Sequence, residues 1–413
     1  MTIDILPDDV LVEIFFYVNI KIMPDLRHPW RVLVRMCRRW RYIVFASPRR
    51  LNLRLEYEEH RPMSEALGPW PVLPAILISI MGDLHSGLPN PKSDQQWDNV
   101  VAALKSEHYG RIHGIQIISM TNSHLERLAA AMQKPFPELT HLELSVVSEV
   151  VPVLPDSFLG GSAPRLQTLS LDGIPFPSIP KLLLSANGLV TLSLLDISHS
   201  GYFSPDAMGT ALTVMTKLES LELRFCSPQS RPDSASRPLP SHTRFVLPVL
   251  SRLTFEGVYE YLDLLARIHA PLLDYLHITS SMDLNSDVPQ LQRLIGHSEE
   301  FKAFNYAGVV ISGHLIQLNL YPKSRAVYHS QMLMLDIDCG DWQLSSLARG
   351  SSFPLTSALE ELKIICRCTG KTTWRTLNGW NFSVRSLLRR ISIFRIGSHH
   401  LFSVHCLSFP EKG

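Results

Sequence analysis

Apolar residues recur at helical spacing in two stretches near the start of the chain. In the first, Val10, Leu11, Ile14 and Phe15 form one stripe, and Asp8 begins an acidic first turn that suits the unpaired N–H groups there. In the second, one helix is expected to run until Pro48 ends it, with apolar residues Trp30, Leu33, Val34, Cys37 and Trp40. Such short helices bury little surface alone. They form either a docking module that a partner covers or a helical cap on a larger fold.

The middle of the chain repeats a hexad of the form apolar-x-x-apolar-x-apolar. Leucine fills all three apolar positions in the hexads 139–144, 166–171 and 218–223. This pattern resembles the leucine-rich-repeat signature, in which a strand with alternate residues in a stacked core is followed by a return segment. Ordinary α/β packing is the alternative. The hexads begin at Ile112, Leu139, Leu166, Leu189, Leu218, Leu250, Leu273, Phe301, Met332 and Leu359.

The segments between hexads predict the return path. Helices are expected within 125–133, 206–215, 261–268 and 289–295. Proline often precedes the hexad, where it would end a helix and set the path into the next strand, as at Pro137, Pro164, Pro248 and Pro271. Residues 56–108 contain several prolines and indicate a junction, and residues 227–242, rich in Ser, Pro and Arg, predict an exposed loop.

Side chains between the leucines would point outward from a parallel sheet on the concave face of a solenoid, which is the usual partner surface of such folds. They are polar and mixed in charge, so a solvated face with no partner is the alternative. The candidate substrate face consists of His141, Glu143, Thr168, Ser170, Thr191, Ser193, Glu219, Glu222, Arg224, Arg252, Thr254 and Glu256.

Composition narrows the class of protein. The 413 residues include 39 Lys and Arg against 38 Asp and Glu, and this balance supplies no long-range field for a dedicated nucleic-acid binder. An apolar fraction of 45% is typical of a folded chain. The N-terminus lacks a secretory signal, and the longest apolar stretch, 72–81, is too short for a bilayer. We therefore expect no membrane contact, a cytoplasmic or nuclear location, and reduced thiols rather than disulfides for the six unpaired cysteines.

No catalytic, cofactor-binding or metal site is predicted. The segment 370–372 reads Gly-Lys-Thr, but Ile365 replaces the first glycine of a phosphate loop. The segment 296–300 lacks the closing glycine of a nucleophile elbow. A third candidate is a group of possible zinc ligands near the end of the chain, which lacks the paired ligand spacing of a zinc finger. Its members are Cys366, Cys368, His399, His400, His405 and Cys406.

Two runs in the first fifty residues together resemble an F-box, closest to the F-box proteins of mushroom-forming (basidiomycete) fungi. They are Leu-Pro-Asp-Asp-Val-Leu-Val-Glu-Ile-Phe at 6–15 and the Cys-Arg-Arg-Trp group at 37–40. The run Arg-Arg-Leu-Asn at 49–52 departs from the Leu-Trp pair that many F-boxes carry there. The resemblance implies binding to the Skp adaptor of a cullin-RING ubiquitin ligase. By the same resemblance, the residues that face or support the adaptor, or pack the helices, are Leu6, Pro7, Val10, Leu11, Ile14, Phe15, Leu33, Val34, Cys37, Trp40 and Ile43.

The last residues do not continue the repeat. Codons can be chosen for 370–402 so that reading one base earlier gives a peptide similar to the C-terminal repeats of the same family, which suggests a frame shift between 362 and 369.

The organisation expected is an α/β fold with an F-box in 1–55, a junction in 56–108, an irregular leucine-rich-repeat solenoid in 109–364 and an irregular tail in 365–413. The expected function is that of a substrate receptor that does no chemistry itself. The alternative is a protein-binding scaffold without a ligase role.

Overall fold

The structure, a computed structural model, describes residues 5–17, 30–47, 51, 53–57, 62–67, 75–81, 91–148, 151–226, 244–257, 260–280, 306–312, 315–321, 332–338, 361–366, 390–396 and 401–408. Beyond residue 280 the description covers the backbone and its strand pairing. The chain packs as two compact units, Met1–Ser178 and Ile179–Gly413. The division falls inside the stretch that the hexads mark as one repeat region. The fold is α/β with a large parallel sheet, as the sequence predicts.

Unit 1 begins with three short helices, which, with the residues that flank them, we call the helical module: α1 (Asp8–Tyr17), α2 (Trp30–Met36) and α3 (Arg38–Ala46). The single helix expected up to Pro48 is divided at Cys37, whose backbone is extended and whose Sγ accepts the Trp40 N–H at 3.4 Å. The helical spacing of apolar residues in the sequence therefore continues across Cys37, although this residue caps the start of a new helix. The module has its own core, formed by Leu11, Val12, Phe15, Trp30, Leu33, Val34, Ile43, Val44, Leu51 and Leu53.

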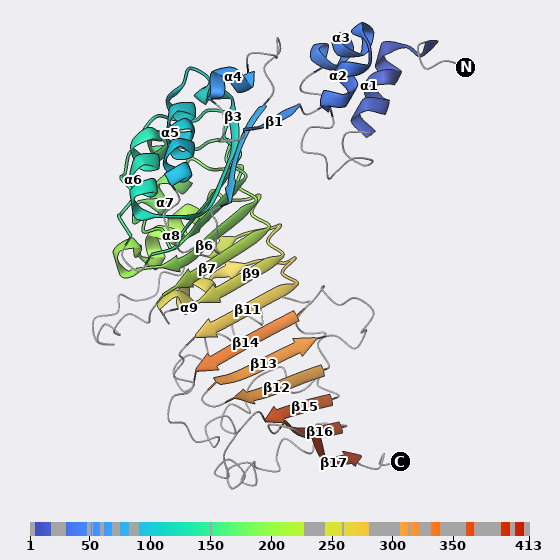
Figure 1. The fold of residues 1–413 in the computed structure, drawn as a ribbon. Coiled ribbons are helices and arrows are strands. Elements are labelled where there is room, and N and C mark those ends of the chain that lie inside the picture. The colour runs from blue at the N-terminus through green and yellow to red at the C-terminus, as the bar shows by residue number, and fades with distance from the viewer. Residues whose placement is uncertain are drawn as a thin grey trace. The chain divides into compact units, whose positions relative to one another are not determined.

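The sheet of unit 1 consists of five parallel strands that lie side by side in chain order. They are β1 (Arg54–Tyr57), β2 (Ala75–Met81), β3 (Ile112–Met120), β4 (His141–Val146) and β5 (Thr168–Asp172). Between them run α4 (Met63–Leu67), α5 (Pro91–Lys105), η3 (Tyr109–Arg111), α6 (Asn122–Ala131) and η4 (Phe158–Gly161). In Figure 1, α5 and α6 lie together against one face of this sheet. The region expected as a junction thus contains a strand, β2, that pairs directly with β3.

Unit 2 continues with α7 (Ile179–Leu183), β6 (Thr191–Ile197), η5 (His199–Gly201), α8 (Pro205–Leu212), β7 (Ser220–Phe225), β8 (Phe245–Val246), β9 (Arg252–Glu256), α9 (Glu260–Leu265), β10 (Ile268–His269) and β11 (Tyr275–Ser280). The strands β6, β7, β9 and β11 pair in parallel in that order. Strands β8 and β10 form a separate parallel pair. The helices expected within 125–133, 206–215 and 261–268 overlap α6, α8 and α9.

The same tight turn precedes six of the hexads. The first leucine of the hexad donates its N–H to the carbonyl three residues earlier: Leu139 to Phe136 at 3.2 Å, Leu166 to Ala163 at 3.2 Å, Leu189 to Ala186 at 3.1 Å, Leu218 to Met215 at 3.2 Å, Leu250 to Leu247 at 3.3 Å and Leu273 to Ala270 at 3.2 Å. The prolines noted in the sequence occupy the second position of four of these turns, where their fixed φ is favourable. Proline therefore shapes the turn that leads into the strand.

The strand order changes after β11. The remaining strands are β12 (Tyr306–Ser312), β13 (Leu315–Tyr321), β14 (Met332–Asp338), β15 (Glu361–Cys366), β16 (Arg390–Ile396) and β17 (Leu401–Ser408). The expectation that every hexad strand lies beside the preceding one is wrong here, because β11 pairs with β14 and not with β12. Strands β12 and β13 form an antiparallel hairpin between β14 and β15.

The tail contributes strands to this sheet. β16 pairs in parallel with β15, and β17 pairs antiparallel with β16. Several expected features lie outside the described residues: the loop 227–242, the helix 289–295, the start of the hexad at Phe301, and most of the segments considered for phosphate, nucleophile or zinc chemistry.

Candidate functional site

The residues that the F-box resemblance assigns to the adaptor fall into three groups in the helical module. Pro7, Val10 and Cys37 are exposed. Leu6, Ile14 and Trp40 are partly buried and pack against the core of the module. The others lie inside that core: Leu11, Phe15, Leu33, Val34 and Ile43. Phe15 and Trp40 join α1 to α3, with ring centroids 4.8 Å apart.

The same module exposes large apolar side chains that the sequence did not single out, with the exception of Val10. Their exposed fractions are Ile5 67%, Val10 39%, Phe16 40%, Tyr17 53%, Val32 44%, Met36 63% and Tyr42 72%. These seven exposed side chains lie outside the core of the module, which other side chains fill. Exposed apolar groups concentrated on one small unit are typical of a surface that a partner covers.

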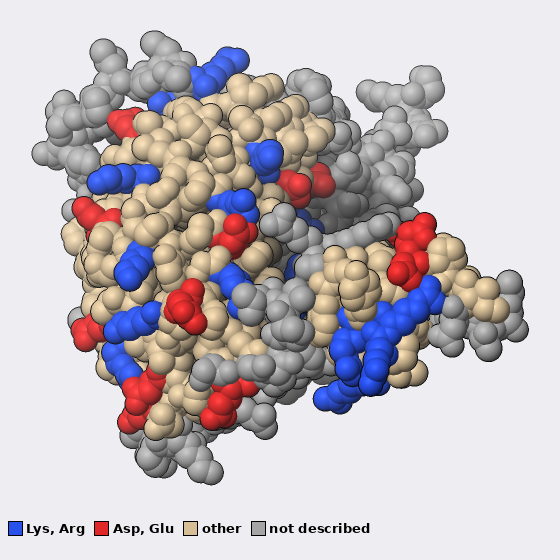
Figure 2. All heavy atoms as spheres, turned by 90° about the horizontal axis from the view of Figure 1, so that it is seen from above, with Lys and Arg blue, Asp and Glu red and all other residues tan. Residues whose placement is uncertain are grey.

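Basic side chains gather on one side of the helical module, at the right of Figure 2. The described ones are Arg35, Arg38, Arg39 and Arg41. Arg39 forms an ion pair with Asp8 at 2.6 Å and also donates to the Leu6 carbonyl at 2.5 Å, which ties α3 to the start of α1.

In unit 1, the outward side chains line up across the strands. His141 lies in register with Thr168, and Glu143 with Ser170. Alternation along β4 leaves these side chains outward, because Leu142 and Leu144 are fully buried. Gln116 on β3 also belongs to this face, and it donates to Glu143 Oε2 at 2.8 Å. It was not among the predicted residues, although the hexad that begins at Ile112 places it between the buried Ile115 and Ile117.

In unit 2, three rows of outward side chains cross β6, β7 and β9. Thr191, Ser220 and Arg252 form one row, and Ser193, Glu222 and Thr254 form the next. Ser193 donates to Glu222 Oε2 at 3.1 Å. Glu219 is exposed just before β7, and its carbonyl accepts the N–H groups of residues 251 and 252.

Arg224 is the centre of the third row. Its guanidinium lies 3.3 Å from Glu256, 3.7 Å from Glu222 and 3.7 Å from Asp196. Asp196 has a φ of 48° and lies where the register between β6 and β7 shifts after Leu194. The bulge therefore turns outward a residue that strict alternation would bury. This cluster consists of exposed ion pairs, which contribute little to stability individually.

Two histidines of unit 1 are biased toward the neutral form. Burial lowers the pKa of His141, and the charges of Arg54 and His113 lower it further. Burial is also the main cause that lowers the pKa of His124, with Arg127 adding to it and Asp94 opposing it. The His124 ring stacks on Trp97 at 4.2 Å between centroids, which joins α6 to α5.

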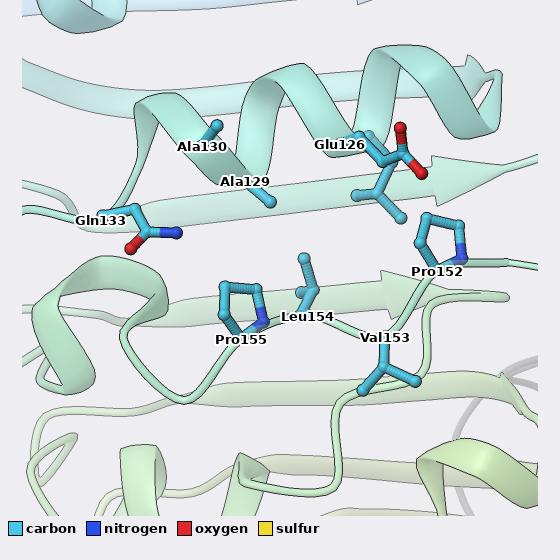
Figure 3. Close-up of a pocket in the computed structure, with 9 residues that line it drawn as sticks. Glu126, Ala129, Ala130, Gln133, Pro152, Val153, Leu154 and Pro155 are labelled. Carbon is cyan, nitrogen blue, oxygen red and sulfur yellow. The ribbon is translucent and has the colours of Figure 1, made fainter.

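A small hollow of about 210 Å³ lies between α6 and the segment 152–155 (Figure 3). Its walls are mainly apolar, with Ala129, Leu154 and Pro155 among the lining residues and the carboxylate of Glu126 at one side. Within the described ranges, no group of three or more His, Cys, Asp or Glu side chains could hold a metal ion. None of the described helices has the length and apolarity needed to cross a membrane.

Comparison of the chain with protein-family models and with curated proteins finds no match.

Proposed function

We propose that this chain is the substrate-receptor subunit of a Skp-cullin-F-box ubiquitin ligase. In this proposal the helical module is the F-box and binds the Skp adaptor. The parallel strands form an irregular leucine-rich-repeat solenoid whose outward polar rows bind a protein substrate. The chain itself does no chemistry, because its role is to hold the substrate near a ubiquitin-transferring enzyme.

The observation that carries the proposal is the apolar surface of the helical module. A three-helix unit that already has a core gains nothing from seven further exposed apolar side chains unless another protein covers them. The motif residues and this surface belong together, since Leu11 and Phe15 are the buried side of α1 and Val10 and Phe16 are part of its exposed side.

The outward rows support the substrate half of the proposal. Fixed strand register holds side chains such as Ser193, Glu222 and Thr254 at constant spacing across the sheet. Such rows present a surface on which a partner can be recognised at many points. They would serve equally in a scaffold that has no ligase role, which is the alternative function.

Co-purification with the Skp adaptor of the source organism separates these two functions. The informative variant is Val10→Ser/Phe16→Ser, which removes exposed apolar groups from α1 and leaves its buried side intact. The matched control is Val246→Ser/Leu272→Ser, which removes two apolar side chains, 55% and 58% exposed, from unit 2. We expect the wild type and the control to retain the adaptor and the α1 variant to lose it. Absence of the adaptor from the wild-type sample would favour the scaffold instead.

A further inference from the structure

The hollow between α6 and the segment 152–155, which we call the α6 hollow, lies on the helix side of unit 1 (Figure 3). Its buried lining residues are Leu125 and Ala129 of α6 and Leu154 of the facing segment. The buried leucines of β4 face the helices, so the outward side chains of this strand point away from α6. The α6 hollow is therefore separate from the candidate substrate face.

Hydrogen bonds fix both walls of the α6 hollow. The Leu154 N–H donates to the Pro175 carbonyl at 2.9 Å, which ties the segment 152–155 to the residues that follow β5. The Ser157 hydroxyl donates to Gln133 Oε1 at 2.7 Å, which joins the end of this segment to the residues that follow α6. Because the walls are already held together, a partner that enters the hollow meets a preformed site and binding orders little of the chain.

The size of the α6 hollow suits one large side chain. Its volume of about 210 Å³ is below the range of roughly 300–1,000 Å³ that is typical of pockets for whole small molecules. The short side chains of Ala129 and Ala130 leave this space open, and Val153, 48% exposed, extends the apolar rim. An aliphatic or aromatic side chain placed here would be removed from water on several sides.

Two polar side chains stand at opposite ends of the α6 hollow, Glu126 at one end and Gln133 at the other (Figure 3). Arg127, the neighbour of Glu126, pairs with Asp98 instead, and no described Lys, Arg or His lies within ion-pair distance of Glu126. The Gln133 amide oxygen accepts from Ser157, whereas its nitrogen donates to no acceptor among the described residues. The rim therefore offers one negative charge and one hydrogen-bond donor to a ligand.

We propose that the α6 hollow binds a short segment of a partner protein that carries a large apolar residue and, within three residues of it, a Lys or Arg. The apolar side chain fills the hollow, the cation pairs with Glu126, and a backbone carbonyl of the segment accepts a hydrogen bond from Gln133. Three extended residues span about 10 Å, and long basic side chains add reach, so one short segment makes all three contacts.

A peptide segment fits this site better than the other classes of ligand. A nucleic acid would bring phosphates toward the carboxylate of Glu126, which repels them. A lipid chain needs a longer apolar channel than a hollow of this volume provides. The proposal holds whether or not the chain is a ligase subunit, because it uses neither the helical module nor the outward rows.

The test selects peptides from a random seven-residue library displayed on phage, with the immobilised full-length chain as the target. We expect enrichment of peptides with a large apolar residue and a Lys or Arg within three positions. Synthetic copies, measured by fluorescence polarisation, should bind Ala130→Phe at least tenfold more weakly than the wild type, because the new ring occupies the hollow. The matched control is Ala102→Phe, which adds the same ring at an exposed alanine of α5 and should bind as the wild type does.

Glu126→Lys tests the charge of the rim separately. At about 0.1 M salt it should weaken binding of the basic peptides roughly three- to tenfold, and the loss should shrink near 1 M salt. A peptide in which Glu replaces the basic residue should prefer Glu126→Lys to the wild type, an exchange that a purely structural role of Glu126 does not produce. Glu107→Lys is the control, because it changes the net charge equally at an exposed residue that does not line the hollow.

Four results would overturn the proposal. The library yields no enriched sequence; the enriched peptides bind Ala130→Phe as tightly as the wild type; they lack a basic residue and bind Glu126→Lys unchanged; or the chain associates with itself and Ala130→Phe abolishes this association, which makes a second copy the occupant. Circular dichroism of each variant checks that the fold is intact.

Discussion

Two neighbouring residues of β9 should differ sharply in what they contribute to the stability of unit 2. Leu253 is fully buried and lies in register with Leu221 and Leu276, which are also buried. Leu253→Ala leaves a cavity between these two leucines, so we expect a loss of about 2–5 kcal/mol in the free energy of unfolding. Thr254, one residue further, lies on the outward row, and Thr254→Ala should change this free energy by no more than about 0.5 kcal/mol.

Urea unfolding followed by far-ultraviolet circular dichroism and by tryptophan fluorescence measures both changes. With a slope of about 3 kcal/mol per molar, a loss of about 3 kcal/mol lowers the midpoint by roughly 1 M. Thr254→Val serves as a control, because it keeps the β-branched shape while it removes the hydroxyl. Equal losses for Leu253→Ala and Thr254→Ala would refute the assignment of buried and outward faces along this strand.

Three further changes have defined outcomes. Tyr261→Phe removes the hydroxyl that donates to the Phe203 carbonyl at 2.7 Å, and the unpaired buried carbonyl should cost about 1–3 kcal/mol in thermal or urea unfolding. Ser204→Ala removes the side-chain cap at the start of α8 and should cost about 0.5–2 kcal/mol in the same assay, whereas Ser204→Asp should restore most of it. His124 has a lowered pKa in the folded state, so the unfolded chain binds the proton more readily and stability should fall as the pH drops below about 6.5. His124→Phe keeps an aromatic ring beside Trp97 and should reduce this pH dependence to the part that His141 contributes, and an unchanged slope would contradict the assignment.

The hexads predicted the strands well where leucine fills the buried positions. In β4, β5 and β7 the outward residues follow directly from alternation with two buried leucines. Two features of the sheet could not be predicted from this alternation with leucine. The strand β2 is an almost continuous apolar run with no hexad, and the extra residue at Asp196 reverses the alternation in β6. A bulge inserts one extra residue into a strand, and the pattern of apolar and polar residues alone does not predict where it occurs.

The antiparallel pair that interrupts the parallel strands after β11 has a simple local cause. Strands β12 and β13 are each seven residues long, and only residues 313–314 separate them. Two residues beginning with glycine suit a hairpin turn but cannot span the crossover that parallel strands need. The antiparallel pair could therefore have been predicted from the short connection and from the glycine in it. It was missed because the hexad pattern begins at Phe301 and implies that every strand returns in the same direction.

The helical module shows why sequence alone could not divide the motif residues between core and partner surface. Every apolar residue of an F-box-like motif could serve either purpose, since both demand a helical stripe. Packing resolves the ambiguity: Leu11, Phe15 and Ile43 are used inside the module, so they cannot also be the exposed contact. What remains outward on α2 and α3 is a mixture of apolar groups and arginine, such as Met36 beside Arg35. In this arrangement the buried motif residues maintain the shape of the module, and only the outward side chains are available to contact a partner.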